Sequence, residues 1–107
     1  MSDYTPDRWV ILEMTFDGQT IRKVFGGWYG GYTSGDSWRT NSGIENIIDQ
    51  GEYYDIIGYS GSTYKCIKVH EGMSFYMGGL LNNWNQQAKE EGIAEIKVID
   101  MKDYYNE

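Results

Sequence analysis

Aromatic and polar side chains of the kind that bind ligands gather in one glycine-rich segment, residues 26–43 (GGWYGGYTSGDSWRTNSG). Tryptophan and tyrosine supply rigid contact area, arginine supplies a planar set of donors, and glycine lets a ligand approach backbone N–H groups. Long connecting segments of this kind are uncommon and are often functional. The residues expected to bind are Trp28, Tyr29, Tyr32, Asp36, Trp38, Arg39 and Asn41, together with Tyr59 and Tyr64, which we expect at the adjoining end of the sheet.

The sequence leaves two interpretations of this segment open. In the first it is a recognition loop, and a small-ligand pocket of nucleotide type formed by Trp28, Trp38, Arg39 and Tyr59 is one variant of it. In the second it is a structural lid over the open end of the sheet, with Asp36 and Arg39 paired locally. The run GGWYGG matches neither GxGxxG nor the P-loop pattern, so a phosphate-binding loop has little support.

Catalytic and metal-binding patterns are weak. Ser37, His70 and Asp36 are the residue types of a serine hydrolase, but no serine lies in a GxSxG turn. The chain has one histidine and one cysteine, Cys66, and no HExxH spacing, which argues against a zinc site. Cys66 lies in an alternating stretch and is expected to be a small core residue. We therefore expect no enzymatic activity, no metal and no cofactor.

Acidic residues dominate the charge. The 107 residues include 16 Asp or Glu and 9 Lys or Arg, for a net charge of −7. Binding to nucleic-acid backbone or to an anionic membrane needs clustered basic residues, so both are disfavoured. No Lys or Arg occurs from 40 to 64, where the densest unpaired acidic run is Glu45, Asp49, Glu52 and Asp55. An acidic surface fits a basic protein partner, and it also serves solubility.

A β-hairpin is the clearest of the elements that must position these residues. Segments 9–16 (WVILEMTF) and 20–25 (TIRKVF) are rich in β-branched and aromatic residues. They flank an Asp-Gly pair at 17–18, a strong signal for a two-residue turn. Such a turn places Glu13 opposite Arg22, which pairs opposite charges across the two strands.

Further strands are expected at 44–48 and 53–59, which form a second hairpin, and at 63–69 and 93–99. In the last of these, Ala94, Ile96 and Val98 are expected to face the core.

One helix is predicted over residues 76–91, with Ser74 as its N-cap and Gly92 as the residue that ends it. Its apolar stripe consists of Met77, Leu80, Leu81, Trp84 and Ala88. The order β-β-β-β-β-α-β predicts an α+β fold, an antiparallel sheet of five to six strands with one helix packed on one face. The chain is expected to be one domain, with an ordered core from 8 to 99 and a frayed tail from 100 to 107.

The segments GGWYGGYTSGDSWRTNSGI at 26–44 and GYSGSTYKC at 58–66 resemble those of small uncharacterised proteins encoded by tailed bacteriophages. The resemblance covers most of residues 8–70 and carries over no functional residues. It implies a context, that of an accessory protein in the cytoplasm of an infected bacterium. Small acidic phage proteins often bind and block a host factor, so we expect non-enzymatic binding of a host protein, such as a defence component. Small-ligand binding is the alternative, and a role in the virion stays open.

Overall fold

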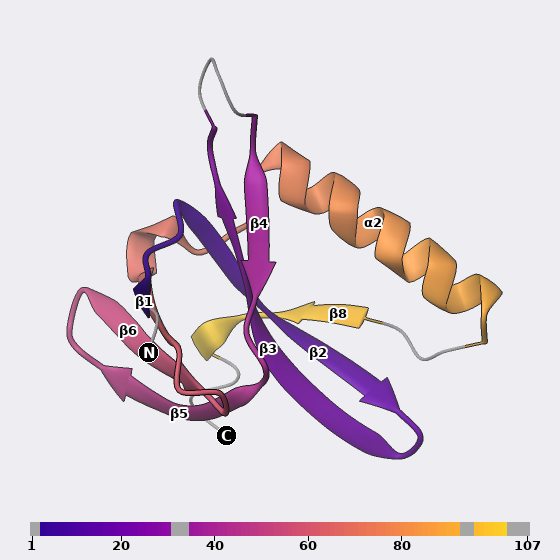
Figure 1. The fold of residues 1–107 in the computed structure, drawn as a ribbon, viewed down its shortest axis with the longest axis horizontal. Coiled ribbons are helices and arrows are strands. Elements are labelled where there is room, and N and C mark those ends of the chain that lie inside the picture. Colours follow the sequence, from indigo (N-terminus) through magenta and orange to yellow (C-terminus); the bar gives the residue numbers. More distant parts are fainter. Residues whose placement is uncertain (1–2, 31–34, 93–95, 103–107) are drawn as a thin grey trace.

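The computed structural model describes residues 3–30, 35–92 and 96–102 (Figure 1). The elements in chain order are β1 (Asp3–Tyr4), β2 (Arg8–Phe16), β3 (Gln19–Trp28), β4 (Ser37–Thr40), β5 (Ile44–Asp49), β6 (Tyr53–Gly58), β7 (Thr63–Ile67), the 3-10 helix η1 (Lys68–His70), α2 (Phe75–Glu90) and β8 (Ile96–Ile99). This order confirms the α+β class and the second hairpin. Strands β1 and β4 were not predicted.

The strands of the described residues form two four-stranded sheets rather than the single sheet that we expected. Sheet A has the order β1-β7-β6-β5, and sheet B has the order β4-β3-β2-β8. Neighbouring strands are antiparallel, except that β1 runs parallel to β7. The prediction of one sheet of five to six strands is therefore wrong in layout and in strand number.

The hairpin of β2 and β3 has the predicted register. Asp17 and Gly18 have φ angles of 54° and 80°, and two positive φ angles are what a type I′ turn requires. Glu13 lies opposite Arg22, and the Arg22 Nε donates to Glu13 Oε2 over 2.9 Å.

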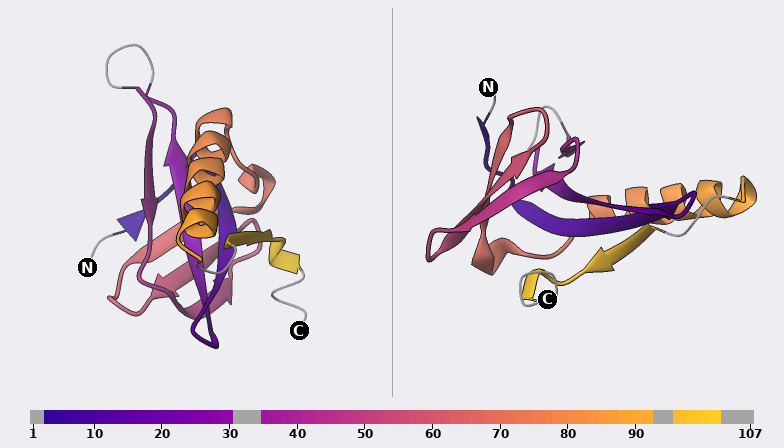
Figure 2. Two further views of the ribbon diagram at one scale, coloured as in Figure 1. Left: turned by 90° about the vertical axis from the view of Figure 1, so that its right-hand side faces the viewer. Right: turned by 90° about the horizontal axis from the view of Figure 1, so that it is seen from below.

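Sheet B is the middle one of three layers. Figure 2 shows α2 lying along β2 and β3, with β5 and β6 on the other side of them. The core between the two sheets consists of Trp9, Ile11, Val24, Ile56, Tyr64, Cys66 and Met101. The core under α2 consists of Val10, Leu12, Phe25, Met77 and Leu81.

The start of β2 explains why a single sheet with one helix cannot bury the apolar residues of this chain. Residues 9–12 (WVIL) are all apolar, and none of their side chains is more than 4% exposed. Successive side chains on a strand point to opposite faces, so continuous burial requires a covering layer on each face. The helix covers one face of β2, and sheet A must cover the other.

The helix is close to its prediction. The Ser74 hydroxyl accepts a hydrogen bond from the Met77 N–H over 3.2 Å, and Gly92 has a φ of 73° just beyond the helix. Leu81 is buried, as expected. Trp84 is only partly buried, and its ring packs against Phe25 and Trp38.

The C-terminal part differs from the expectation. Strand β8 begins at Ile96, and residues 93–95, including Ala94, lie outside the described residues. Ile96 packs against the core under α2, whereas Val98 is 40% exposed. Met101, which was assigned to a frayed tail, is 1% exposed, and its N–H donates to Glu71 Oε2 over 2.8 Å. The prediction of a frayed tail is therefore wrong at Met101.

Candidate functional site

Much of the glycine-rich segment is a hairpin rather than a loop, because β3 extends to Trp28 and β4 pairs with it. Trp38 lies opposite Gly27 in this pairing. Near the end of the hairpin, the Gly30 N–H donates to Asp36 Oδ1 over 3.2 Å. A side chain on Gly30 would collide with the Gly35 carbonyl, so glycine is required there. Tyr32 lies outside the described residues.

Trp38 and Arg39 point to opposite faces of β4. The Trp38 ring meets the Trp84 ring edge-on at 4.8 Å and the Phe25 ring at 6.1 Å, on the α2 face of sheet B. The Arg39 guanidinium lies 4.6 Å from the centre of the Tyr4 ring, on the other face. A single pocket lined by both side chains is therefore not formed.

Trp28 and Tyr29 hold the N-terminal segment against β3. The Trp28 indole N–H donates to the Thr5 carbonyl over 3.0 Å, and the Tyr29 backbone N–H donates to Asp7 Oδ2 over 2.9 Å. The Trp28 ring also meets Tyr4 edge-on at 6.3 Å. The Tyr29 side chain is 59% exposed and remains available to a partner.

Asn41 and Tyr64 are buried, so neither offers a surface to a partner. The Asn41 Oδ1 accepts from the Val24 N–H over 3.0 Å, which fixes the link between β4 and β5. Tyr64 is 1% exposed between the two sheets, and burial raises the pKa of its hydroxyl to about 12. Burial also raises the pKa of the Cys66 thiol, which keeps it protonated and weakly nucleophilic.

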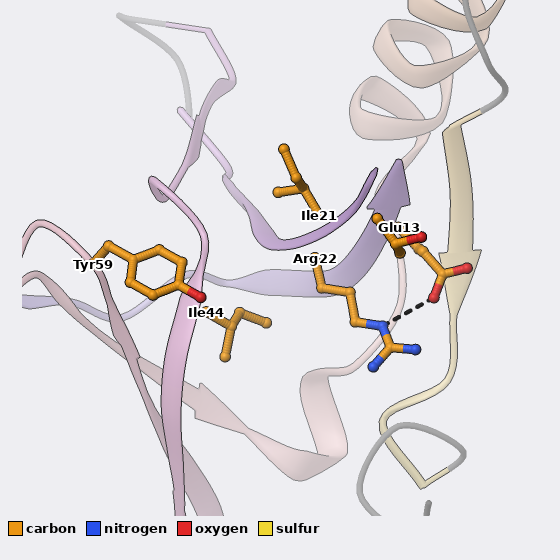
Figure 3. A pocket seen from close by; sticks show the side chains of 6 residues that line it. Glu13, Ile21, Arg22, Ile44 and Tyr59 are labelled. Atoms are coloured by element: carbon orange, nitrogen blue, oxygen red, sulfur yellow. Dashed lines mark hydrogen bonds and ion pairs between the residues drawn. The ribbon is translucent and has the colours of Figure 1, made fainter. Parts of the chain in front are cut away.

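Tyr59 lies away from the hairpin of β3 and β4, which we call the aromatic hairpin. It is in the turn between β6 and β7 and is 68% exposed. It lines a hollow of about 530 Å³ between sheet A and the β2–β3 hairpin, which we call the inter-sheet pocket (Figure 3). The pocket is lined by Glu13, Thr20, Ile21, Arg22, Ile44 and Tyr59. Of the eight expected binding residues that the structure describes, only Tyr59 lines it.

The face of sheet A that points away from sheet B is a second candidate, which the sequence reading missed. Burial alternates along β7, where Tyr64 and Cys66 are buried and Lys65 is exposed. The strand register extends this outward side across the sheet, and we call it the outer sheet face. It carries Ile48, Tyr53, Asp55, Ile57, Lys65 and Ile67. The signal that could have revealed this face is in the runs YYDIIG and TYKCI, where isoleucine occurs at positions that point to both faces of the strands.

Charged groups border the outer sheet face. Glu45 and Glu52 are exposed, and Asp55 lies on the face itself. Asp49 forms an ion pair with Lys68 at 2.9 Å, so the expectation of a fully unpaired acidic run is wrong at this residue. Hydrogen bonds from the Lys68 side chain and from the Gly51 backbone lower the pKa of the Asp49 carboxyl.

Within the described ranges, no three His, Cys, Asp or Glu side chains gather as a metal-binding group. Across the same part of the chain, no helix has the length and apolar character needed to cross a membrane.

Comparison with known proteins gives no match: no family model, no curated protein and no solved structure matches the chain.

Proposed function

We propose that this protein acts by binding, without catalysis, another protein whose contact surface is basic, and that it binds through the outer sheet face. The observation that carries the proposal is the composition of this face. Ile48, Ile57, Ile67 and Tyr53 lie on a side of sheet A that is outside both cores. Apolar side chains grouped on a protein surface are typical of interaction sites.

Charge supports a basic partner. The hairpin of β5 and β6 carries four carboxylates and no Lys or Arg. The lysines next to it are already in contact with other groups: the Lys65 ammonium lies 4.4 Å from the centre of the Tyr53 ring, and Lys68 binds Asp49. An apolar face that carries Asp55 and is bordered by further carboxylates matches a partner patch in which Lys or Arg accompanies apolar residues.

The likeness to phage-encoded proteins supports a bacterial host protein as the partner, with inhibition or modulation of that protein as the outcome. The aromatic hairpin has less support as the binding surface. Trp38 packs on Trp84 and Phe25, and Arg39 lies over Tyr4 on the opposite face. These contacts favour a structural role for the segment, as part of sheet B rather than as a lid with Asp36 paired to Arg39.

The test begins with capture of partners from a bacterial lysate and purification of the protein retained in stoichiometric amount. Its affinity is then measured by surface plasmon resonance for the wild type and for Ile48→Lys. Ile48 is 41% exposed, so the substitution changes the outer sheet face without opening the core. Val69→Lys is the matched control, because Val69 is 82% exposed and lies outside sheet A, in η1.

We expect Ile48→Lys to weaken binding at least tenfold, since it replaces an apolar contact by a charge that a basic partner repels. Val69→Lys should bind within about twofold of the wild type. Equal affinities of the two variants, or a lysate that yields no stoichiometric partner, would contradict the proposal.

A further inference from the structure

The inter-sheet pocket has one wall from each sheet. Ile44 and Tyr59 come from the sheet A side, and Glu13, Thr20 and Arg22 come from the β2–β3 hairpin (Figure 3). Its volume of about 530 Å³ falls within the range of small-molecule sites, about 300–1,000 Å³. It lies apart from the outer sheet face, which does not include any of its lining residues.

Tyr59 is an exposed aromatic ring on a fixed backbone. The Tyr59 N–H donates to the Gly43 carbonyl over 3.3 Å, and the Ser60 N–H donates to the Ser42 hydroxyl over 3.0 Å. The ring lies against Gly43, where a Cβ would come within 2.9 Å of two ring carbons. Gly43 also has a φ of 135°, so glycine is required for both reasons. An aromatic surface that is held in place and still 68% exposed can stack on a planar ligand with little entropic cost.

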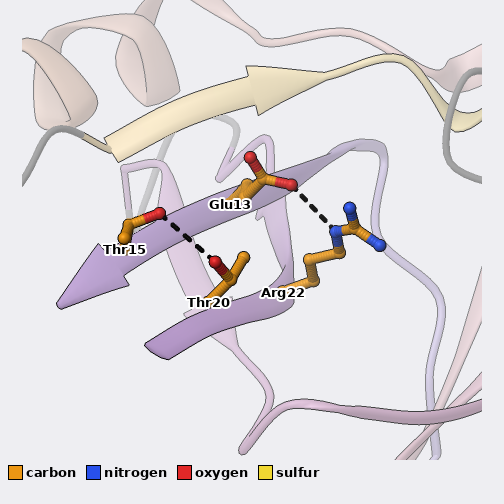
Figure 4. A network of polar contacts seen from close by, with 4 residues as sticks. All are labelled: Glu13, Thr15, Thr20 and Arg22. Atoms are coloured by element: carbon orange, nitrogen blue, oxygen red, sulfur yellow. Dashed lines mark hydrogen bonds and ion pairs between the residues drawn. The ribbon is translucent and has the colours of Figure 1, made fainter. Parts of the chain in front are cut away.

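The opposite wall supplies hydrogen-bonding groups of both kinds. The Glu13 and Arg22 side chains are fixed by their 2.9 Å ion pair, with exposed fractions of 22% and 30% (Figure 4). A carboxylate only accepts hydrogen bonds and a guanidinium only donates them, so the pair presents acceptor and donor side by side. The Thr20 hydroxyl, 3.5 Å from that of Thr15, can do either.

The geometry points to a site for a neutral planar heteroaromatic molecule of the nucleobase or nucleoside class. The ring stacks on Tyr59, and its polar edge meets Glu13 and Arg22. The two charges of the ion pair compensate each other, and the protein as a whole carries −7. The pocket therefore favours an uncharged nucleoside over its phosphate ester. This site is independent of the proposed protein-binding function.

The experiment is an NMR titration of the ¹⁵N-labelled protein with adenosine, guanosine, cytidine and uridine. It is repeated with the four nucleoside 5′-monophosphates. We expect saturable shifts at Tyr59, Ile44 and Arg22 with at least one nucleoside, and weaker binding of the matching monophosphate. The absence of saturable shifts at these residues with all four nucleosides would overturn the proposal.

Two variants test the Tyr59 wall, and a third is their control. Tyr59→Ala should weaken binding about tenfold, and Tyr59→Phe, which keeps the ring, should stay within about twofold of the wild type. Tyr29→Ala removes another exposed tyrosine that is outside the pocket and should have no effect. An unchanged affinity of Tyr59→Ala would overturn the assignment.

Glu13→Gln tests the polar wall, because it should change which of the two ligands is preferred rather than abolish binding. Without the carboxylate, this wall of the pocket carries one negative charge less, so the monophosphate should gain about tenfold relative to the nucleoside. A preference identical to that of the wild type would show that the ion pair does not face the ligand. Ile48→Lys should leave nucleoside binding intact, which separates this site from the outer sheet face.

Discussion

Gly18 and Gly79 show how one residue type has opposite effects in two backbone settings. Gly18 has a φ of 80° in the turn between β2 and β3, a conformation that side chains with a branched Cβ avoid. Gly79 lies within α2, and a Cβ there would meet nothing within 4 Å. The first glycine is required by geometry, whereas the second only adds freedom to the unfolded chain.

Gly18→Val should lower the free energy of unfolding by about 1 kcal/mol or more, because valine is strained at positive φ. Gly79→Ala should raise it by about 0.5–1 kcal/mol, as expected for an exposed helix position. Urea denaturation followed by circular dichroism measures both values. A destabilised Gly79→Ala would show that the start of α2 needs glycine for a reason other than its backbone.

Tyr64 and Cys66 should make the free energy of unfolding depend on pH in the alkaline range. Burial raises the pKa of the Tyr64 hydroxyl from 10.0 to about 12 and also raises the pKa of the Cys66 thiol above 9.0. The folded protein thus holds protons that the unfolded chain releases, so the free energy of unfolding should fall as the pH rises above 9. Tyr64→Phe should remove the part of this decline between pH 10 and 12. Urea titrations at stepped pH check this, and a flat profile of the wild type from pH 9 to 12 would refute it.

Among the elements, those defined by local sequence were predicted well. The β2–β3 hairpin follows from its Asp-Gly turn and complementary strands, and α2 follows from its apolar stripe and its cap. Strand β4 was missed, since its sequence SWRT has no apolar alternation and it forms only by pairing with the glycines of β3. Strand β1 has two residues and pairs with β7, about sixty positions away, which no local pattern can reveal.

The candidate sites depend more strongly on how the two sheets pack. Tyr59 was expected at the end of the sheet that adjoins the aromatic segment, but it lies away from that segment, in the turn between β6 and β7. Its pocket partners Glu13 and Arg22 were expected only as a cross-strand pair, because their position opposite Ile44 depends on how sheet A packs on sheet B. Asn41 and Tyr64 were expected to bind, but their burial depends on the same packing.

Ser74 should contribute measurably to the stability of α2. Ser74→Ala removes the acceptor of the Met77 N–H and should cost about 1 kcal/mol. Ser74→Asp keeps an acceptor and adds a negative charge at the helix N-terminus, so its stability should match or exceed that of the wild type. Thermal unfolding followed at 222 nm compares the three proteins. Equal melting temperatures for Ser74→Ala and the wild type would mean that water replaces the cap.

For the whole molecule, the arrangement of charge predicts how the proposed partner is reached. Glu45 and Glu52 are exposed on the β5–β6 hairpin, whereas Glu90 and Glu91 lie at the end of α2, which packs on the opposite face of sheet B. Removing two charges at either place changes the net charge equally. Only the first pair lies beside the outer sheet face.

The double variant Glu45→Gln/Glu52→Gln should therefore slow association with a basic partner several-fold, while Glu90→Gln/Glu91→Gln should have a smaller effect. Raising the ionic strength from about 0.05 to 0.5 M should reduce the association rate of the wild type by about tenfold, because exposed charges are screened. Stopped-flow measurement with the purified partner gives these rates. If the association rate changes neither with ionic strength nor in Glu45→Gln/Glu52→Gln, electrostatic steering does not contribute to binding.

The position of β8 has a consequence for how the chain is made. β2 lies between β3 and β8 in sheet B, so one of its two edges stays unpaired until residues 96–99 are available. Met101 then completes the core between the sheets. A ribosome adds residues from the N-terminus, and an open, apolar strand edge is a template for aggregation while synthesis continues. Chains that lack residues 96–101 should therefore leave this edge of β2 unpaired and the core between the sheets incomplete, and they should aggregate more readily than chains that contain them.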